Sequence, residues 1–522
     1  MIGLRLKANY YRIARLGKVP HDLQRLITLL LFYIVALDEL KAATYLVEEH
    51  SINSIALNSA FVAGAYGADS SFYNPANLSL GGLGPSYSKD GYQLEISTSL
   101  ILSGGFSFDT ANRSEGINII GTPGVIPSGH YCEVNGETVQ DSPLPNKNSC
   151  GPPRLDGQAA STLRALPSIF FRSSILKLPL NLRFAYGFSF TQPSSPSTKW
   201  SGKGGAQLRN FTVTTMEFAP VASLAWGEVV ALGLGLRVGH TSLSLDGSVF
   251  TKMNYTDEFS ILTATGTART EQAYDASGWG VGYNIALSAR PFVLTKWDLL
   301  KNLRLALNYR SGLKLDLGGK IYYQTHLYMG RNFAAMRGYV ETRGDSRVGN
   351  DLPPLLSIAL SQDFFNHRLE VVYERRFWTQ ARVLDLARLN EVYRVDNLKG
   401  LGAAFINPEE LSPSMDNSST AYAANWQDTS SVKLGYSYFG TGYKLMGSLA
   451  FDEGAAPRNN FGLLNTTSLG LGLGARKALL NDRLDVGLAY SVKFRELSNS
   501  YINLKSGSNQ VHLFSLGARY SW

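Results

Sequence analysis

The feature of this sequence that most constrains its fold is an alternation of apolar residues with polar or small ones, which recurs from about Gly91 to the C-terminus. In the last such segment, one face is apolar throughout and consists of Phe514, Leu516, Ala518, Tyr520 and Trp522. The other face carries Arg519 and several small residues beside Val511 and Leu513. Successive side chains of a β-strand point to opposite faces, so a period of two predicts strands.

Fourteen segments follow this pattern, and turn-rich stretches separate them. Their approximate spans are 91–109, 161–173, 180–192, 211–226, 228–246, 277–290, 303–325, 351–363, 368–378, 427–439, 443–454, 462–478, 484–496 and 510–522. Short connections such as 440–442 alternate with long ones at 110–160, 247–276 and 379–426. An even strand count with short turns at one end and long loops at the other is typical of a transmembrane β-barrel. The predicted fold class is therefore all-β, a 14-stranded antiparallel barrel.

The composition supports a membrane environment. Charged residues make up 17% of the chain, whereas soluble proteins carry about 25%. The apolar run Leu26–Leu37 is too short for a spanning helix, which needs about 20 residues, so a helical membrane protein is excluded. A soluble β-sandwich would have a polar outer face, and a β-propeller would show a repeat of about 40–50 residues. Neither feature is present, and a closed barrel also pairs its whole backbone within lipid.

The net charge of +8 raises the question of nucleic-acid binding. Half of this excess lies in residues 1–43, which carry seven Lys or Arg against three Asp or Glu. No dense basic stripe occurs elsewhere, so we expect no nucleic-acid partner. The basic start, the apolar run and the small residues Ala42 and Ala43 predict that 1–43 is an export signal or leader. An ordinary N-terminal amphipathic helix is the alternative.

The two cysteines, Cys132 and Cys150, lie in one polar stretch rich in Pro, Gly and Asn, between Asn112 and Gly157. In an exported chain, this arrangement favours a disulfide that closes a loop. A metal site would need further ligands, and only His130 is near. We therefore expect neither a metal nor a cofactor.

Residues 44–90 show no strand-length alternation and are rich in small residues. They precede the predicted barrel, residues 91–522. A barrel of fourteen strands is wide enough to leave an open lumen unless something fills it. We therefore predict that 44–90 forms a plug, or hatch, inside the lumen.

Several motifs occur in an order that resembles a known family. Ala68–Ala76, with the sequence ADSSFYNPA, looks like the hatch signature of the FadL/TodX family of outer-membrane hydrocarbon transporters. The other motifs that resemble this family are Ala219–Trp226, Leu232–Leu236, Gly278–Asn284, Leu305–Ser311, Leu352–Pro354 with Trp378, Asn425–Asp428 and Lys433–Gly435. The resemblance covers most of residues 55–522.

The resemblance implies a fourteen-stranded barrel with an N-terminal hatch that passes long-chain fatty acids or aromatic hydrocarbons without an energy source. An external apolar groove would capture the ligand, a pocket beside the hatch would hold it, and a kink in the third strand would release it sideways into the membrane. The candidate binding residues in the hatch are Phe72, Tyr73, Asn74, Pro75 and Ala76. For Asn74-Pro75-Ala76, the alternative is a structural turn that fixes the hatch.

In the third strand, Gly187 suits a bulge or kink. It could equally give packing room. Leu386 and Leu389, with Tyr393, have helical spacing within 383–393 and are candidates for a wall of the external groove. The loop before them offers Leu327, Tyr328, Met329, Phe333 and Met336. All these loop residues could instead pack the loops together. The cations available for an anionic head group are Arg331, Arg337, Arg382 and Arg388.

An enzyme is not expected. A barrel hydrolase would need serine, histidine and an orienting polar group together, and His240 with Ser242 and Ser244 is the one candidate. A hydrophilic porin and a structural or adhesive barrel are the functions that compete with hydrocarbon transport. The expected partners are a hydrophobic ligand, outer-membrane lipid and lipopolysaccharide. The barrel assembly machinery would recognise the last strand through its terminal Trp522, and the protein would be a monomer.

Overall fold

The computed structural model describes most of the chain after residue 45. The described residues are 46–81, 84, 91–109, 131–134, 137–140, 150–151, 157–194, 196–202, 209–256, 263–295, 300–329, 336–382, 385–399, 420–421, 426–455, 467–495 and 503–522. The predicted export signal at 1–43 lies outside them. None of the helices in these ranges is long and apolar enough to cross a bilayer.

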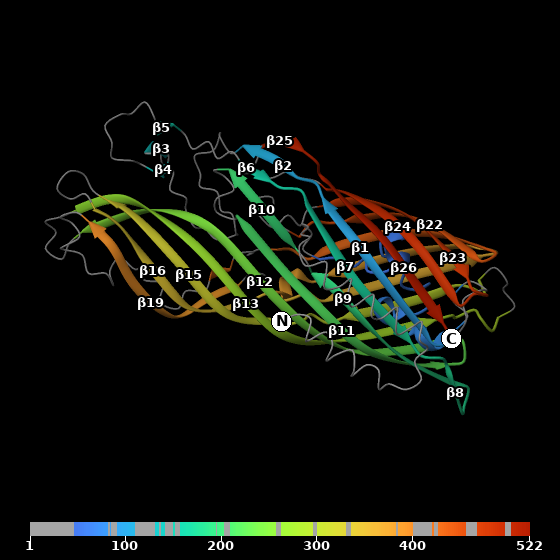
Figure 1. The fold of residues 1–522 in the computed structure, drawn as a ribbon. Coiled ribbons are helices and arrows are strands. Elements are labelled where there is room, and N and C mark those ends of the chain that lie inside the picture. Colours follow the sequence, from blue (N-terminus) through green and yellow to red (C-terminus); the bar gives the residue numbers. More distant parts are fainter. Residues whose placement is uncertain are drawn as a thin grey trace. The chain divides into compact units, whose positions relative to one another are not determined.

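Fourteen strands of the described residues form a closed antiparallel ring, as the alternation predicts. In order around the ring they are β1 (Gln93–Ser103), β7 (Thr162–Arg172), β9 (Leu182–Ser194), β11 (Asn210–Trp226), β12 (Val230–Thr256), β13 (Thr263–Ala289), β14 (Arg304–Arg310), β17 (Leu355–Phe364), β18 (His367–Arg376), β21 (Thr429–Gly440), β22 (Tyr443–Asp452), β23 (Ser468–Leu479), β24 (Leu484–Arg495) and β26 (Gln510–Ser521). The first and last strands close the ring, with Gln93 opposite Ser521 and Ser103 opposite Val511 (Figure 1). The prediction of a 14-stranded barrel is confirmed.

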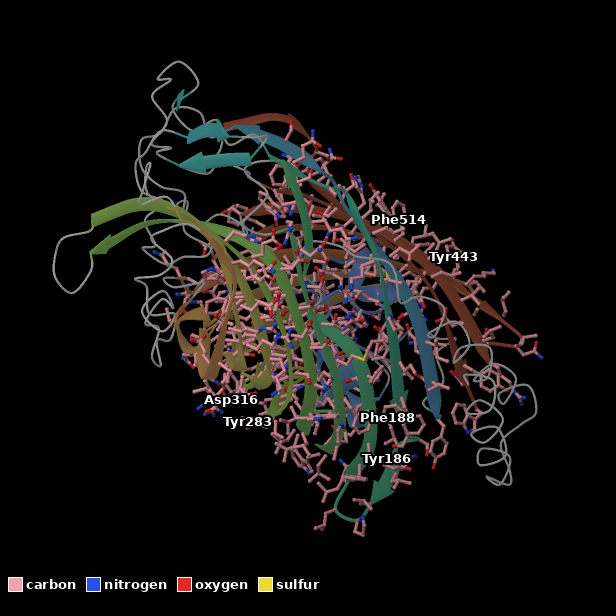
Figure 2. The ribbon with its side chains drawn as sticks, turned by 60° about the vertical axis from the view of Figure 1, so that its left-hand side comes forward. Tyr186, Phe188, Tyr283, Asp316, Tyr443 and Phe514 are labelled. Carbon is pink, nitrogen blue, oxygen red and sulfur yellow. The ribbon has the colours of Figure 1, made fainter. Side chains whose placement is uncertain are left out.

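Alternate residues of these strands face outward and are apolar. Along β12, Leu232, Leu234 and Leu236 are about half exposed, whereas Arg237 is buried. Figure 2 labels Tyr186, Tyr283, Tyr443 and Phe514 among the outward side chains. A wall with apolar residues outside and polar residues inside is suited to lipid and not to water.

Five strands extend beyond the ring at one end (Figure 1). β12 and β13 each have 27 residues, and the sheet continues through β15 (Asp316–Met329), β16 (Met336–Gly349) and β19 (Asp385–Lys399). Two predictions are therefore wrong. The connection 247–276 is mostly strand rather than loop, and 383–393 contributes to strand β19 instead of a helix.

The strand β19, which carries Leu386, Leu389 and Tyr393, is irregular. β19 pairs with β16, and the register shifts along the pair: Leu389 is opposite Asp345, whereas Val392 is opposite Arg343. One extra residue therefore stands on β19, where Asn390 has a φ of +53°. Such a bulge changes the phase of the two-residue alternation along the strand.

The remaining strands are short. They are β2 (Phe106–Asp109), β3 (Tyr131–Val134), β4 (Glu137–Gln140), β5 (Cys150–Gly151), β6 (Gly157–Ala159), β8 (Leu176–Leu178), β10 (Ser197–Gly202), β20 (Thr420–Ala421) and β25 (Asn503–Gly507), and a 3₁₀ turn spans Trp378–Gln380. In the separate sheet β4-β3-β5, the backbone register places Cys132 opposite Cys150.

Residues 46–81, which we call the N-terminal segment, contain the helices α3 (Ile52–Ala56), α4 (Ser70–Tyr73) and α5 (Asn77–Leu80). A capping box begins α3. The Ser51 hydroxyl accepts from the Ser54 backbone N–H, and the Ser54 hydroxyl accepts from the Ser51 backbone N–H. Apolar residues of this segment form most of the main buried cluster, together with inward residues such as Leu166 and Phe170.

Candidate functional site

Two asparagines fix the turn between α4 and α5, and Asn74 ties it to the barrel wall. The Asn74 amide donates to the Val62 carbonyl at 2.9 Å and to the Ser288 hydroxyl of β13 at 2.8 Å. Ser288 in turn donates to the side-chain oxygen of Asn77 at 2.7 Å. A Cβ on Gly233 of β12 would lie 2.3 Å from the Ala76 nitrogen, so only glycine admits the turn there. These contacts support the structural role of Asn74-Pro75-Ala76.

Phe72 and Tyr73, which belong to the same signature, line a cavity beside the N-terminal segment. The Phe72 ring packs edge-on against Phe170 of β7, with centroids 6.4 Å apart, and the Arg310 guanidinium lies 3.9 Å above the ring centroid. The Tyr73 hydroxyl accepts from the His50 backbone and bonds to Ser54. Burial raises the pKa of Tyr73, so this hydroxyl stays protonated.

The cavity is open to solvent, and the empty space within it and at its mouth is about 600 Å³. Its apolar wall comes from both the N-terminal segment and the barrel and consists of Leu46, Val47, Val62, Phe72, Pro193, Leu352, Pro353 and Leu355. Binding sites for small apolar molecules are typically concave and largely apolar. The cavity is thus the candidate binding site.

Charged side chains complete the lining. On one side, the lining residues are Arg237 of β12 and Arg310 of β14, which pair at 2.6 Å and 2.8 Å with Glu217 of β11; Glu217 itself is not a lining residue. On the other side, Arg376 of β18 pairs with Glu48. Burial would raise the pKa of Glu48, but Arg376 and Lys433 outweigh it and lower the pKa to about 2. Glu48 is therefore ionised and holds the N-terminal segment to the wall.

The cavity reaches an irregular part of β9. The Val47 backbone donates to the Pro193 carbonyl at 2.9 Å, and the pairing of β9 with β11 shifts its register between Thr215 and Glu217. In the described register, β7 pairs with β9 only where Ile169–Arg172 lies against Gly187–Phe190. The wall of the cavity therefore includes the point where regular pairing of β9 ends.

Gly187 is not at this irregularity. It pairs with Arg172 of β7 and Val221 of β11. A Cβ on Gly187 would lie 2.3 Å from the Phe171 carbonyl oxygen, so the glycine permits a close approach of two strands. Of the two alternatives for Gly187, these contacts support packing room, and the irregular register of β9 lies beyond Thr191.

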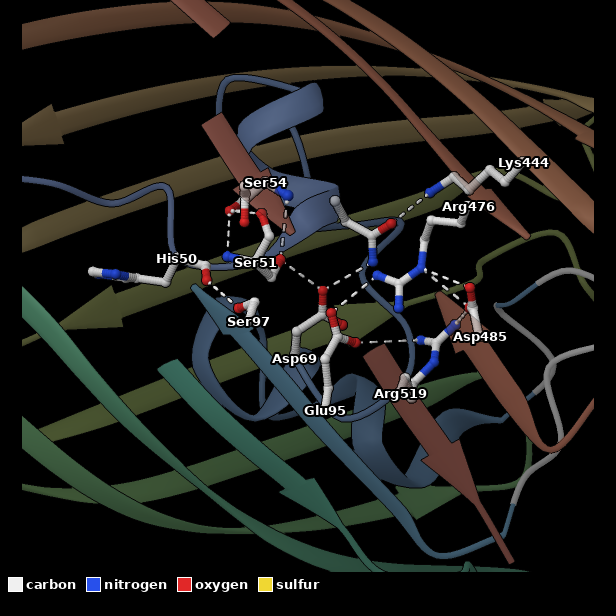
Figure 3. Close-up of polar contacts among 12 residues, drawn as sticks. His50, Ser51, Ser54, Asp69, Glu95, Ser97, Lys444, Arg476, Asp485 and Arg519 are labelled. Atoms are coloured by element: carbon white, nitrogen blue, oxygen red, sulfur yellow. Dashed lines mark hydrogen bonds and ion pairs between the residues drawn. The ribbon is translucent and has the colours of Figure 1, made fainter. Parts of the chain in front are cut away.

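The opposite side of the N-terminal segment adjoins a buried ion cluster (Figure 3). Arg476 of β23 bonds to Glu95 of β1 at 2.9 Å and to Asp485 of β24 at 3.1 Å. Arg519 of β26 bonds to Asp485 at 2.5 Å. Since Glu95 and Arg519 lie on the first and last strands, this cluster spans the seam that closes the ring.

Asp69 belongs to the N-terminal segment and lies close to this cluster. Its carboxylate accepts from the Ser51 hydroxyl at 2.8 Å and from the Asn53 amide at 2.9 Å. Burial and the neighbouring Glu95 raise the pKa of Asp69 to about 6. Farther along, Glu370 of β18 accepts from three successive backbone N–H groups, those of Val62, Ala63 and Gly64.

Comparisons with known proteins agree with this geometry. Residues 108–520 match the family model described as outer membrane protein transport protein (OMPP1/FadL/TodX). The chain belongs to this family. No protein of curated function matches the sequence.

Solved structures of FadL/TodX type share the fold. A Pseudomonas aeruginosa FadL homologue is 14% identical, with a TM-score of 0.59 over 92% of this chain and 100% of that one. The P. putida toluene transporter TodX is 15% identical, with a TM-score of 0.54 over 91% and 99%. The CymD monoaromatic hydrocarbon channel is 14% identical, with a TM-score of 0.52 over 92% and 99%. As a FadL/TodX family member, the protein is an outer-membrane protein.

The structure separates several further candidates from the cavity. Leu386 and Leu389 lie on β19, where their backbones pair with Val348 and Asp345. Leu389 does not line the cavity, and the side chain of Leu386 is outside the described residues. Arg382 is held by Asp351 and Asp316. Arg331 lies outside the described residues, as do the side chains of Arg337 and Arg388. The proposed external groove therefore stays a prediction.

The hydrolase candidate lies on the barrel wall. The His240 ring is 4.7 Å from that of Trp279, and the Trp279 side chain is 69% exposed on the outer face.

The charged residues at the cavity were missed by sequence reasoning. Glu217, Arg237 and Arg310 stand singly in three strands, and their one local signal is a charge on the small-residue face of a strand.

Proposed function

We propose that this protein is a passive channel for hydrophobic molecules across the outer membrane, in which the N-terminal segment is the hatch. The cavity between this segment and the wall supports the proposal, because it is lined mainly by apolar side chains and adjoins the irregular part of β9. The cargo would move from an external groove to the cavity and leave sideways near Pro193. By name, related proteins carry toluene and monoaromatic hydrocarbons.

The physical reason for a sideways exit is the cost of returning an apolar molecule to water. Each buried methylene contributes about 0.8 kcal/mol, so a chain of several methylenes leaves an apolar cavity readily only into lipid. A hatch in the lumen would prevent direct passage of water-soluble molecules. A hydrophilic porin or an adhesive barrel would require neither the hatch nor the apolar cavity.

Filling the cavity tests this function. Leu355 lines the cavity, whereas its neighbour Leu356 is on the opposite face of β17. We expect Leu355→Trp to lower the uptake of radiolabelled hydrocarbon or fatty acid by at least about tenfold, and Leu356→Trp to leave it unchanged. The uptake by both variants would be measured in liposomes that contain the protein, with a sugar as the second solute. Sugar permeation without apolar uptake would favour a porin, and permeation of neither would favour an adhesive barrel.

We further propose the disulfide between Cys132 and Cys150. The register of β3 and β5 supports it, because the two residues are opposite each other on adjacent strands. Thiol alkylation of the exported protein, followed by mass spectrometry, should label both cysteines only after reduction. Labelling without reduction would contradict the disulfide.

The remaining partners follow from the location. We propose that the last strand, which ends one residue before the aromatic Trp522, is recognised by the barrel assembly machinery. The outward apolar face would contact outer-membrane lipid and lipopolysaccharide, and the barrel would act as a monomer. Replacing Trp522 by Ala should lower the amount of assembled protein in the outer membrane.

A further inference from the structure

The charged groups of the cavity are bound to one another. Arg237 grips both oxygens of Glu217, through Nε at 3.0 Å and Nη2 at 2.6 Å, and its third nitrogen donates to the Ser311 carbonyl. Arg310 donates to the same carboxylate at 2.8 Å and to the Phe72 carbonyl at 3.3 Å. Arginines that bind carboxylates in this bidentate way are strongly held. The hydrogen bonds of these guanidinium groups therefore go to other groups of the protein.

The opposite wall repeats this arrangement. Arg376 donates to Glu48, and Lys433 of β21 donates to Glu374 at 2.5 Å and lies 3.7 Å from Glu48. Glu48 and Glu374 themselves line the cavity. An anion that entered would therefore meet two carboxylates as well as the bound cations.

The charges also balance over a wider neighbourhood. Next to this wall, Lys493 pairs with Glu49 at 2.7 Å and with Asp452 at 3.6 Å. The described ion pairs around the cavity thus contain five cations (Arg237, Arg310, Arg376, Lys433 and Lys493) and five carboxylates (Glu48, Glu49, Glu217, Glu374 and Asp452). His50 adds no charge at pH 7, because burial and Arg310 lower its pKa to about 4.

An anionic ligand has no favourable place in such a site. A free carboxylate would lose its hydration and would gain an arginine only by displacing Glu217 or Glu48, which would then be buried without a partner. A neutral ligand requires no such exchange and contacts the apolar wall of Val47, Val62 and Leu352.

We propose that the cavity admits neutral hydrophobic molecules, such as hydrocarbons and esters, and excludes free carboxylates, with Glu217 as the residue that decides this specificity. This inference rests on the proposed function. It narrows the cargo, because long-chain fatty acids and hydrocarbons differ in charge more than in shape.

The experiment compares two ligands that differ only at the head group. Hexadecanoate and its methyl ester would be titrated at pH 8 against the full-length protein in detergent, below their own aggregation concentrations. We expect the ester to bind at least about tenfold more tightly. Glu217→Gln leaves Arg237 and Arg310 with an uncompensated charge, so it should reduce this preference to less than about threefold by strengthening hexadecanoate binding.

Glu228→Gln is the matched control. Glu228 also pairs with two arginines, Arg183 and Arg290, each at 3.2 Å, but these arginines do not line the cavity, whereas Arg237 and Arg310, the partners of Glu217, do. The preference for the ester should therefore stay unchanged in this variant. If Glu217→Gln does not assemble, Glu48→Gln, which releases Arg376, replaces it, with the same expectation.

The outcomes separate the two proposals. Equal binding of both ligands by the wild type, or tighter binding of hexadecanoate, would overturn charge exclusion and leave the transport function standing. Binding of neither ligand would overturn the proposed function itself. An ester preference that Glu217→Gln and Glu48→Gln both leave unchanged would show that Glu217 does not decide the specificity, and would overturn the inference.

Discussion

The N-terminal segment meets the barrel wall in different ways on its two sides. On the side of α3, glycines of β23 let the backbones touch, since a Cβ on Gly472 would lie 2.6 Å from the Ala56 carbonyl oxygen and a Cβ on Gly474 would lie 2.5 Å from the Ala56 side chain. On the side of Phe72, paired arginines and glutamates lie in and next to the wall of an open cavity.

This difference teaches how one barrel wall can both hold the N-terminal segment and leave a cavity beside it. Close packing leaves no room for a ligand, and it holds a segment by many small contacts. Long charged side chains bind the N-terminal segment at single points, as Arg376 binds Glu48, and leave a space between these points. We therefore expect substitutions on the α3 side to change stability, and those on the cavity side to change mainly binding.

The largest effect should come from the buried ion cluster. Arg476→Ala removes the partner of Glu95 and Asp485, all of which are buried. Loss of one partner of a buried ion pair typically costs about 3–5 kcal/mol, so the free energy of unfolding should fall by that amount in a urea titration of the refolded barrel. Lys477→Ala, at the next residue, is the control and should change it by less than about 0.5 kcal/mol. Similar losses in both variants would contradict the importance of the cluster.

The next effect concerns pH. Asp69 has a pKa of about 6 in the folded protein, above the ordinary value near 3.9. The folded state therefore keeps a proton that the unfolded state releases between these values, and the contribution of Asp69 to stability rises as the pH falls from 6 to 4. Relative to Asp69→Asn, the wild type should gain up to about 3 kcal/mol over this range. A constant difference between the two unfolding curves would show that the Asp69 pKa is not raised.

The smallest effect tests the glycine contact. Gly474→Leu forces a side chain against Ala56, and overpacking of this kind costs about 1–3 kcal/mol. Gly447→Leu on the neighbouring β22 is the control, because a Cβ there would meet Leu473 only at 3.5 Å, an ordinary contact distance. Thermal unfolding, followed by electrophoretic mobility, would measure both. If both variants are equally stable, the two sides of the N-terminal segment do not differ in packing.

The fold could be predicted because its signal is local. Apolar residues at every second position mark the face of a strand that contacts lipid. A terminal segment such as 510–522 has this pattern independently of distant residues. Asn74-Pro75-Ala76 could be recognised as a motif for the same reason. Its role could not, because the bond from Asn74 to Ser288 joins residues 214 positions apart.

The sequence by itself determined a lipid-facing barrel of fourteen strands and the position of the hatch motif, since alternation and turn residues act over a few positions. Only the tertiary structure decided that Asn390 forms a bulge and that Glu217 meets Arg237 and Arg310. Both depend on strand register, which is set when the ring closes and all strands bury their inward faces together. A charge on the inner face of a strand is visible in the sequence, but its partner is chosen by that closure.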